Sequence, residues 1–143
     1  MPDILSDLPI QAPLAAVFQA IATPEGLDRW WTRRATGTPI LESEYELGFG
    51  SGVEWQARVT RCLPPTAFEV EITRAGADWI GTRVGFDLAH VDGVTQVRFH
   101  HIGWPHANQH YRASCYCWPM YLRILRRYLE HGESVPYERH LDV

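Results

Sequence analysis

The chain has 143 residues, of which 45% are hydrophobic and 21% charged, and its formal net charge is −4. This length and balance predict one globular domain, residues 1–143, rather than a disordered chain. The acidic balance gives no support to nucleic-acid binding, and the absence of lysine excludes Schiff-base chemistry.

The first part of the chain predicts a strand followed by two helices. Residues 3–11 predict the strand, and Pro9 within it indicates a sheet edge or a strand end. Pro13 suits the first position of a helix, and apolar residues at helical spacing continue to Ile21. Thr23-Pro24-Glu25 then predicts a second, short helix that carries Trp30-Trp31, since it supplies a capping hydroxyl, a proline and an acid.

Beyond Gly37 the hydrophobic period changes to two, which predicts five consecutive strands. Short connections separate them: the Gly50-Ser51-Gly52 turn, Pro64-Pro65, a turn over residues 74–78, and the Asp92-Gly93 hairpin. Such a series forms an antiparallel meander with one apolar and one solvated face. The alternating residues are Tyr45, Leu47 and Phe49; Val53, Trp55, Ala57 and Val59; Phe68, Val70 and Ile72; Ile80, Thr82, Val84, Phe86 and Leu88; and Thr95, Val97, Phe99 and His101.

A long helix, from Tyr111 to about His131, follows a loop over residues 103–109. The second half of its apolar face is leucine, as in an ordinary core, whereas the first half is Tyr, Cys and Trp and favours a cavity lining. Pro119 predicts a kink or break between the halves, and residues 133–143 predict a polar tail. The apolar face comprises Tyr111, Cys115, Trp118, Leu122, Leu125 and Leu129.

The sequence predicts a cytoplasmic protein without membrane insertion. Its N-terminus has no basic segment followed by an apolar one, and no apolar run is long enough to span a bilayer. Three cysteines are too few for a disulfide framework, and Cys115 and Cys117 point to nearly opposite sides of a helix. A reducing cytoplasm is the simplest setting.

Several short motifs, in order, resemble the family named for the activator of the ninety-kilodalton heat-shock protein ATPase, within the START-like, birch-pollen-allergen-like superfamily. The resemblance covers residues 4–132, almost the whole chain. The motifs are Ala20-Ile21-Ala22-Thr23-Pro24-Glu25-Gly26-Leu27 with Trp30-Trp31, Val59-Thr60-Arg61-Cys62-Leu63-Pro64-Pro65, Asp92-Gly93-Val94-Thr95, His101-Ile102-Gly103-Trp104, and Trp118 with Tyr121-Leu122 and Leu125.

The resemblance implies an α+β helix-grip fold, in which a curved antiparallel sheet wraps around the C-terminal helix and leaves a cavity between them. Members of the wider superfamily carry lipids, bind aromatic natural products or plant hormones, or catalyse cyclisation and dehydration of polyketides, so the fold alone does not choose the function. The eukaryotic activators join this module to a separate N-terminal domain, and we do not expect that domain in these residues.

We therefore expect a protein that binds a small hydrophobic or aromatic molecule in this cavity. His101 is the strongest candidate for a polar contact with the ligand, because counting by twos along its strand places it on the face toward the helix. There it can orient a polar group of the ligand. The expected lining residues are Trp31, Trp55, Val70, Thr82, Phe86, Val97, Phe99, His101, Tyr111, Cys115, Trp118 and Leu122.

Two alternatives to binding stay open: an enzyme and a protein-interaction module. A buried His101 is usually structural, but it can also act as acid or base with Tyr111 in a cyclase, dehydratase or hydrolase. Cys115 has no general base beside it in the sequence and is expected to behave as a small hydrophobe. The other alternative is a chaperone-associated interaction module that uses the outer face of the sheet, although that face is charged. Its expected residues are Glu69, Glu71, Arg83, Asp87, Gln96 and Arg98.

We expect no cofactor and no metal. His100 and His101 point to opposite sides of a strand, and the histidines and cysteines that follow fit no standard zinc spacing. No pair of carboxylates is placed inside, and no glycine-rich phosphate loop joins a strand to a helix. Either a monomer or a homodimer is compatible with the sequence.

Overall fold

The computed structural model describes residues 2–143. Met1, which the predicted domain includes, lies outside the described residues. In chain order the elements are β1 (Ile4–Ile10), α1 (Leu14–Ala22), α2 (Pro24–Leu27), β2 (Arg34–Thr36), β3 (Glu44–Gly48), β4 (Glu54–Leu63), β5 (Ala67–Arg74), β6 (Arg83–Val91), β7 (Val94–Ile102), α3 (Gln109–His131) and the 3₁₀ helix η1 (Tyr137–Asp142).

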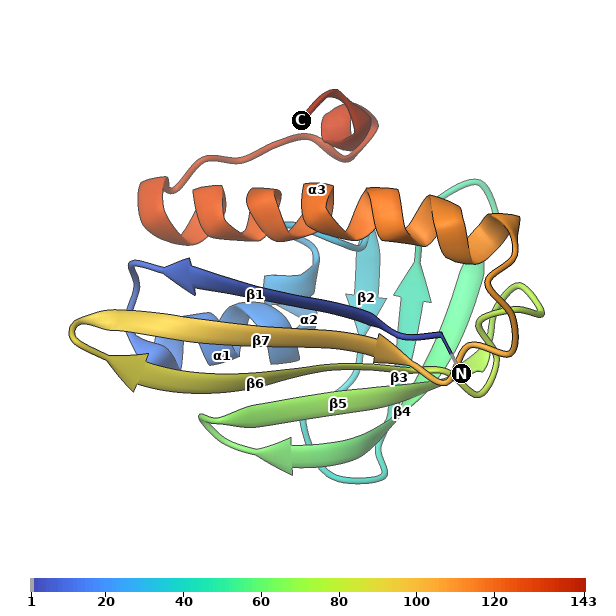
Figure 1. The fold of residues 1–143 in the computed structure, drawn as a ribbon, viewed down its shortest axis with the longest axis horizontal. Coiled ribbons are helices and arrows are strands. Elements are labelled where there is room, and N and C mark those ends of the chain that lie inside the picture. Colours follow the sequence, from blue (N-terminus) through green and yellow to red (C-terminus); the bar gives the residue numbers. More distant parts are fainter. Residues whose placement is uncertain (1) are drawn as a thin grey trace.

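The seven strands form one antiparallel sheet in the order β1-β7-β6-β5-β4-β3-β2. The sheet is strongly curved, and the long helix α3 lies across its concave side, with α1 and α2 behind the sheet edge in the view of Figure 1. The first strand pairs with the last, so β1 forms the edge of the sheet that lies beside α3. The predicted helix-grip fold of the α+β class is confirmed.

The two short helices begin where their capping residues predict. The Thr23 hydroxyl accepts a hydrogen bond from the Gly26 N–H at 3.0 Å and donates to the Gln19 carbonyl at 2.7 Å. A side chain at Gly26 would place its Cβ 2.3 Å from that same carbonyl oxygen, so glycine is what lets α2 pack against the end of α1. The Trp30 indole then donates to the Ala20 carbonyl at 2.9 Å, which holds it against α1, and the Trp31 ring stacks on it with 6.0 Å between centroids.

Two strand predictions differ from the structure. Strand β2 was not expected, because its three residues are too few to show an alternation, but its pairing with β3 gives it a place in the sheet. The fourth strand of the predicted meander begins at Arg83 rather than Ile80, and the Ile80 side chain is 52% exposed in a turn. That turn directs the neighbouring Trp79 inward instead.

A kink or break was expected at Pro119; helix α3 continues through it from Gln109 to His131, so there is no break. Proline removes one hydrogen bond, but packing along the length of the helix keeps the remaining turns in place. Asn108 begins the helix, since its Oδ1 accepts from the Tyr111 N–H at 3.0 Å, and Gly132 ends it in the left-handed region at φ 65°.

The C-terminal tail packs against α3 rather than standing free as a purely polar segment. Its 3₁₀ helix lies on the side of α3 away from β1, as Figure 1 shows at the top of the molecule. His140 of the tail is 4% exposed and packs its ring against Tyr121 of α3 at 5.8 Å between centroids. Helix α3 is thereby covered on two sides.

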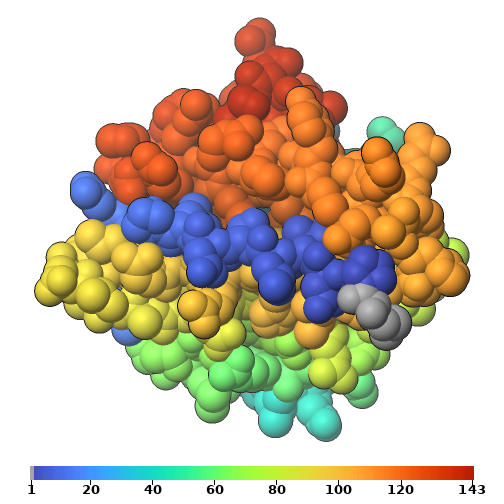
Figure 2. Space-filling view, in the orientation of Figure 1, coloured from blue at the N-terminus to red at the C-terminus, as the bar shows by residue number. Residues whose placement is uncertain are grey.

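Strand β1 is fastened to α3 near both of its ends. The Tyr111 hydroxyl donates to the Asp3 carbonyl at 2.9 Å, and the Gln11 N–H donates to Glu130 Oε2 at 2.8 Å. Figure 2 shows the α3 side chains resting directly on the β1 band, so this face offers no opening into the space between sheet and helix. The edge strand is also protected from pairing with another chain.

Candidate functional site

His101 lies on the inner face of β7, at the centre of the space between the sheet and α3, and is fully buried. The indole Nε1–H of Trp118 donates to His101 Nδ1 at 3.0 Å. His101 Nε2 therefore carries the proton and donates to Thr82 Oγ1 at 2.9 Å, and the Thr82 hydroxyl donates to the Trp79 carbonyl at 2.6 Å. This chain of three hydrogen bonds joins α3, β7 and the β5–β6 turn.

The surroundings of His101 hold its imidazole neutral. Burial is the main cause that lowers its pKa to about 3, and positive charge on His100 and His110 acts in the same direction. Since both ring nitrogens are already bonded within the protein, no nitrogen of His101 is free for a substrate. The arrangement thus gives this histidine a positioning role for Trp118 and Thr82.

Trp79 fills the middle of an aromatic cluster beside His101. Its ring centroid lies 4.5 Å from that of His101 and 4.8 Å from that of Trp55. Trp118 and His110 lie nearly parallel to it, at interplanar angles of 22° and 25°. One indole from a surface turn is therefore enclosed by aromatic rings from β4, β7 and α3.

Two indole N–H groups in this cluster have no hydrogen-bond partner among residues 2–143. They are Nε1 of Trp79, whose side chain is 6% exposed, and Nε1 of Trp104, whose side chain is fully buried. A buried donor without an acceptor costs about 1–3 kcal/mol, so each such group calls for an explanation. The two rings lie close together, with 5.9 Å between their centroids.

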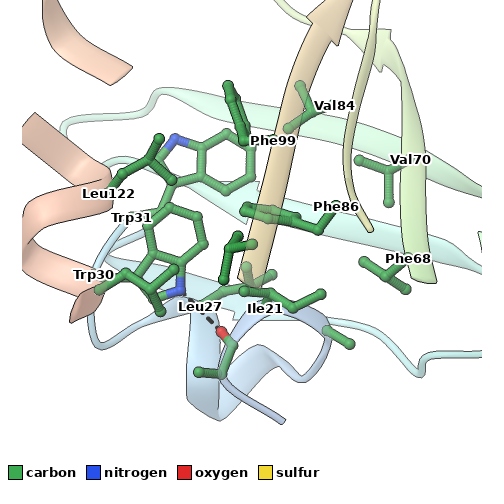
Figure 3. Packing of buried hydrophobic residues seen from close by; sticks show 14 of the residues in the cluster. Ile21, Leu27, Trp30, Trp31, Phe68, Val70, Val84, Phe86, Phe99 and Leu122 are labelled. Atoms are coloured by element: carbon green, nitrogen blue, oxygen red, sulfur yellow. Dashed lines mark hydrogen bonds between the residues drawn. The ribbon is translucent and has the colours of Figure 1, made fainter. Parts of the chain in front are cut away.

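A second part of the interior, which Trp31 helps to line, is almost entirely apolar. It holds a void of about 10 Å³, whereas pockets for small ligands measure about 300–1,000 Å³. Figure 3 shows the surrounding side chains closing in on one another, with Phe86 near their centre. The lining residues are Ile21, Leu27, Trp31, Tyr45, Leu47, Phe68, Val70, Val84 and Phe86.

The structure divides the residues expected to line a cavity between these two parts. Around the void lie Trp31, Val70 and Phe86, and around the aromatic cluster lie Trp55, Thr82, Phe99, His101 and Trp118. The Trp31 and Trp118 rings, with centroids 5.2 Å apart, connect the two parts. Val97 and Leu122 are core residues, buried at 1% and 3% exposure, and Cys115 is half-buried on α3.

Tyr111 does not join His101 at a common polar spot. Its ring packs on Trp104, with centroids 5.3 Å apart, while its hydroxyl bonds to the Asp3 carbonyl at the rim. The residue that reaches His101 instead is Trp79, which lies between the predicted turn over residues 74–78 and the predicted strand that begins at Ile80. The available signal was an aromatic side chain between Gly76 and Gly81, beside the predicted turn.

The family model described as Activator of Hsp90 ATPase homolog 1-like protein matches residues 11–130. The match covers more than half of the chain. The chain belongs to this family. No curated protein matches the sequence.

Several solved structures have the same fold as this chain. The Aha1 dimer from Colwellia psychrerythraea is 28% identical, with a TM-score of 0.83 and coverage of 94% of this chain and 100% of the other. CalU16 from Micromonospora echinospora is 18% identical, with a TM-score of 0.72 and coverage of 91% and 77%. A protein from Mesorhizobium loti is 15% identical, with a TM-score of 0.81 and coverage of 92% and 99%; these last two likenesses concern the fold alone.

The family match ends at residue 130, just before α3 ends, so the tail is additional to the matched span. Across residues 2–143, no helix is long and apolar enough to cross a membrane. Within the same residues, no group of three or more His, Cys, Asp and Glu side chains is arranged to hold a metal ion.

Proposed function

We propose that this family member binds a small hydrophobic molecule between the sheet and α3, and that interior side chains move aside to admit it. The observation that carries the proposal is the pair of buried indole donors, on Trp79 and Trp104, that lack an acceptor in an otherwise apolar space. A ligand that offers an oxygen atom there removes the cost of an unpaired donor. An apolar pocket with a few polar anchors is the usual form of a small-molecule site.

The geometry supports binding better than the alternative of acid–base catalysis. A catalytic imidazole needs a ring nitrogen within reach of the substrate, whereas both nitrogens of His101 bond to Trp118 and Thr82. The neutral state of His101 also suits an apolar pocket, because it avoids placing a charge beside the ligand.

The proposal is tested by titrating the purified protein with decanoic acid and with 2-naphthol while recording tryptophan fluorescence and thermal unfolding. Binding to the folded state alone raises the unfolding temperature as the ligand concentration rises. Trp104→Phe removes one of the two unpaired donors, and we expect it to weaken binding, whereas Val91→Phe on the exposed hairpin serves as the control. Saturation by neither compound, together with no co-purified small molecule in native mass spectrometry, would reject the proposal.

We also propose that the chain forms a homodimer and works in the cytoplasm. The relative from Colwellia psychrerythraea is described as a dimer and is matched over its whole length. All three cysteines are free, as suits a reducing compartment. Sedimentation velocity over a wide range of concentration checks the first point, since a constant mass of 16.4 kDa would identify a monomer.

A further inference from the structure

The Trp79 indole occupies a flat slot rather than a rounded core position. Trp118 and His110 are inclined to it by only 22° and 25°, at centroid distances of 6.1 and 5.8 Å. His101 and Trp104 meet the same indole at steep interplanar angles of 71° and 76°. Such a slot has the shape of a single planar bicyclic ring.

The turn that carries Trp79 is held by its own backbone bonds, not by its side chain alone. The Trp79 N–H donates to the Gly76 carbonyl at 2.9 Å, and the Thr82 N–H donates to the Trp79 carbonyl at 3.0 Å. Ala77, Ile80 and Gly81 of this turn are exposed. Rotation of the Trp79 side chain about its own bonds therefore moves the indole toward solvent without breaking the backbone bonds of the turn.

The unpaired donors give a reason for the Trp79 indole to turn outward. With the indole in its slot, neither Trp79 Nε1–H nor Trp104 Nε1–H has an acceptor among residues 2–143. Once the Trp79 indole swings outward, its N–H bonds to water, and a ligand oxygen in the vacated slot can accept from Trp104. The exchange thus satisfies two donors that are unpaired while the indole occupies its slot.

From these observations we infer that the site takes a flat bicyclic aromatic molecule bearing an oxygen acceptor, and that this molecule displaces the Trp79 indole from its slot. The inference rests on the proposed function and gives it a ligand class. The rings of Trp118 and His110 lie nearly parallel to the indole in the slot, and they favour another planar ring over a flexible alkyl chain. Because Trp79 competes with the ligand for one place, it also sets the apparent affinity.

The test follows the six indole N–H signals of the wild-type protein by heteronuclear NMR, with Trp79 assigned by the signal lost in Trp79→Phe. On addition of 2-naphthol we expect the Trp79 N–H to exchange faster with water and the Trp104 N–H to shift downfield. Trp79→Ala removes the competing ring, and we expect it to bind 2-naphthol about tenfold more tightly or better. Ile80→Ala, on the same turn but exposed, is the matched control and should bind as the wild type does.

Each result separates the inference from the proposed function. Decanoic acid binding with no response of the Trp79 signal to 2-naphthol would overturn the inference and leave the proposed function standing. Binding of 2-naphthol to Trp79→Ala but not to the wild type would also overturn it, since the ligand then fills an engineered hole. If neither the wild type nor any variant binds decanoic acid or 2-naphthol, both the inference and the proposed function are rejected. The wild-type NMR titration remains decisive even if Trp79→Ala does not fold.

Discussion

The Trp118 indole donates its Nε1 hydrogen to Nδ1 of His101 across 3.0 Å, and this one contact fixes the tautomer of the imidazole. An indole nitrogen can only donate, so His101 Nδ1 must accept and Nε2 must hold the proton. That proton points to Thr82, whose hydroxyl continues to the Trp79 carbonyl. The helix, the sheet and the turn that carries Trp79 are therefore joined through a neutral histidine.

Because His101 is neutral in the folded protein, we expect the free energy of unfolding to fall in acid. Below about pH 6.5 the unfolded chain gains a proton on this residue, while the folded chain does not until its pKa of about 3, so the free energy of unfolding falls over that interval. His101→Gln keeps a donor and an acceptor but does not titrate. We expect the wild type to lose about 2 kcal/mol more than this variant between about pH 7 and about pH 5.

Urea denaturation of the two proteins at both pH values measures this difference. His90→Gln, which changes an exposed histidine on the β6–β7 hairpin, should follow the wild type and serves as the control. Parallel losses for wild type and His101→Gln would show that the proton uptake belongs to another group.

A second prediction concerns Asn108, which links the start of α3 to the Trp79 turn. Its Oδ1 caps the helix at Tyr111 N–H, and its Nδ2 donates to Asp78 Oδ1 at 3.0 Å. Asn108→Ala should cost about 1 kcal/mol through the lost cap. Asn108→Asp should keep the cap but repel Asp78, so the turn loosens while the helix stays in place.

Chemical denaturation measures the first effect, and water exchange of the Trp79 indole N–H measures the second. Faster exchange in Asn108→Asp with little change in global stability is the expected pattern. Equal exchange in wild type and Asn108→Asp would show that the Asp78 contact does not restrain the turn.

The strands could be predicted from sequence because their burial repeats every two residues. Val84 and Phe86 on β6, and Val97 and Phe99 on β7, face the core while charged neighbours face water. The same counting placed His101 inward and His100 outward, and the structure agrees. The family resemblance is likewise confirmed by the match over residues 11–130.

Trp79 could not be placed in the same way. Its direction depends on rings from β4, β7 and α3 that are far away in sequence, so local turn chemistry identifies a turn but not what the turn buries. At Pro119 the local rule predicted a kink or break, and packing along α3 keeps the helix continuous through this residue. Long-range packing decided both cases, and both lie next to the candidate site.

A third prediction concerns the tail and its buried histidine. Burial lowers the pKa of His140, whose Nε2 bonds to the Val135 carbonyl at 3.2 Å and whose Nδ1 has no partner. As the pH falls below about 6.5, protonation favours a state in which this ring is solvated. We expect the tail to leave α3 in mild acid, seen as rising backbone mobility of residues 137–142 by ¹⁵N relaxation. His140→Phe should keep the tail docked at low pH, and mobility rising equally in that variant would contradict the role of His140.

The last prediction concerns the outer face of the sheet, where Gly85 lets two side chains meet across a strand. His100 lies over Gly85 and bonds through Nε2 to Glu69 Oε2 at 2.7 Å, and Thr60 donates to the other oxygen of Glu69 at 2.7 Å. A Cβ on residue 85 would lie 2.6 Å from His100 Nε2. Gly85→Ala must therefore push the imidazole off Glu69, and we expect a loss of about 1–3 kcal/mol in unfolding free energy.

The pKa of Glu69 reports whether this mechanism operates. The hydrogen bond from His100 is the main cause that holds the pKa of Glu69 below its usual value, so Gly85→Ala should raise it, as measured by NMR titration of the carboxyl carbon. In a His100→Ala background the alanine at position 85 meets no imidazole, and its cost should shrink. An equal cost in both backgrounds would mean that the strain lies in the sheet backbone or against Glu69 Cβ, which stands 3.0 Å from the added atom.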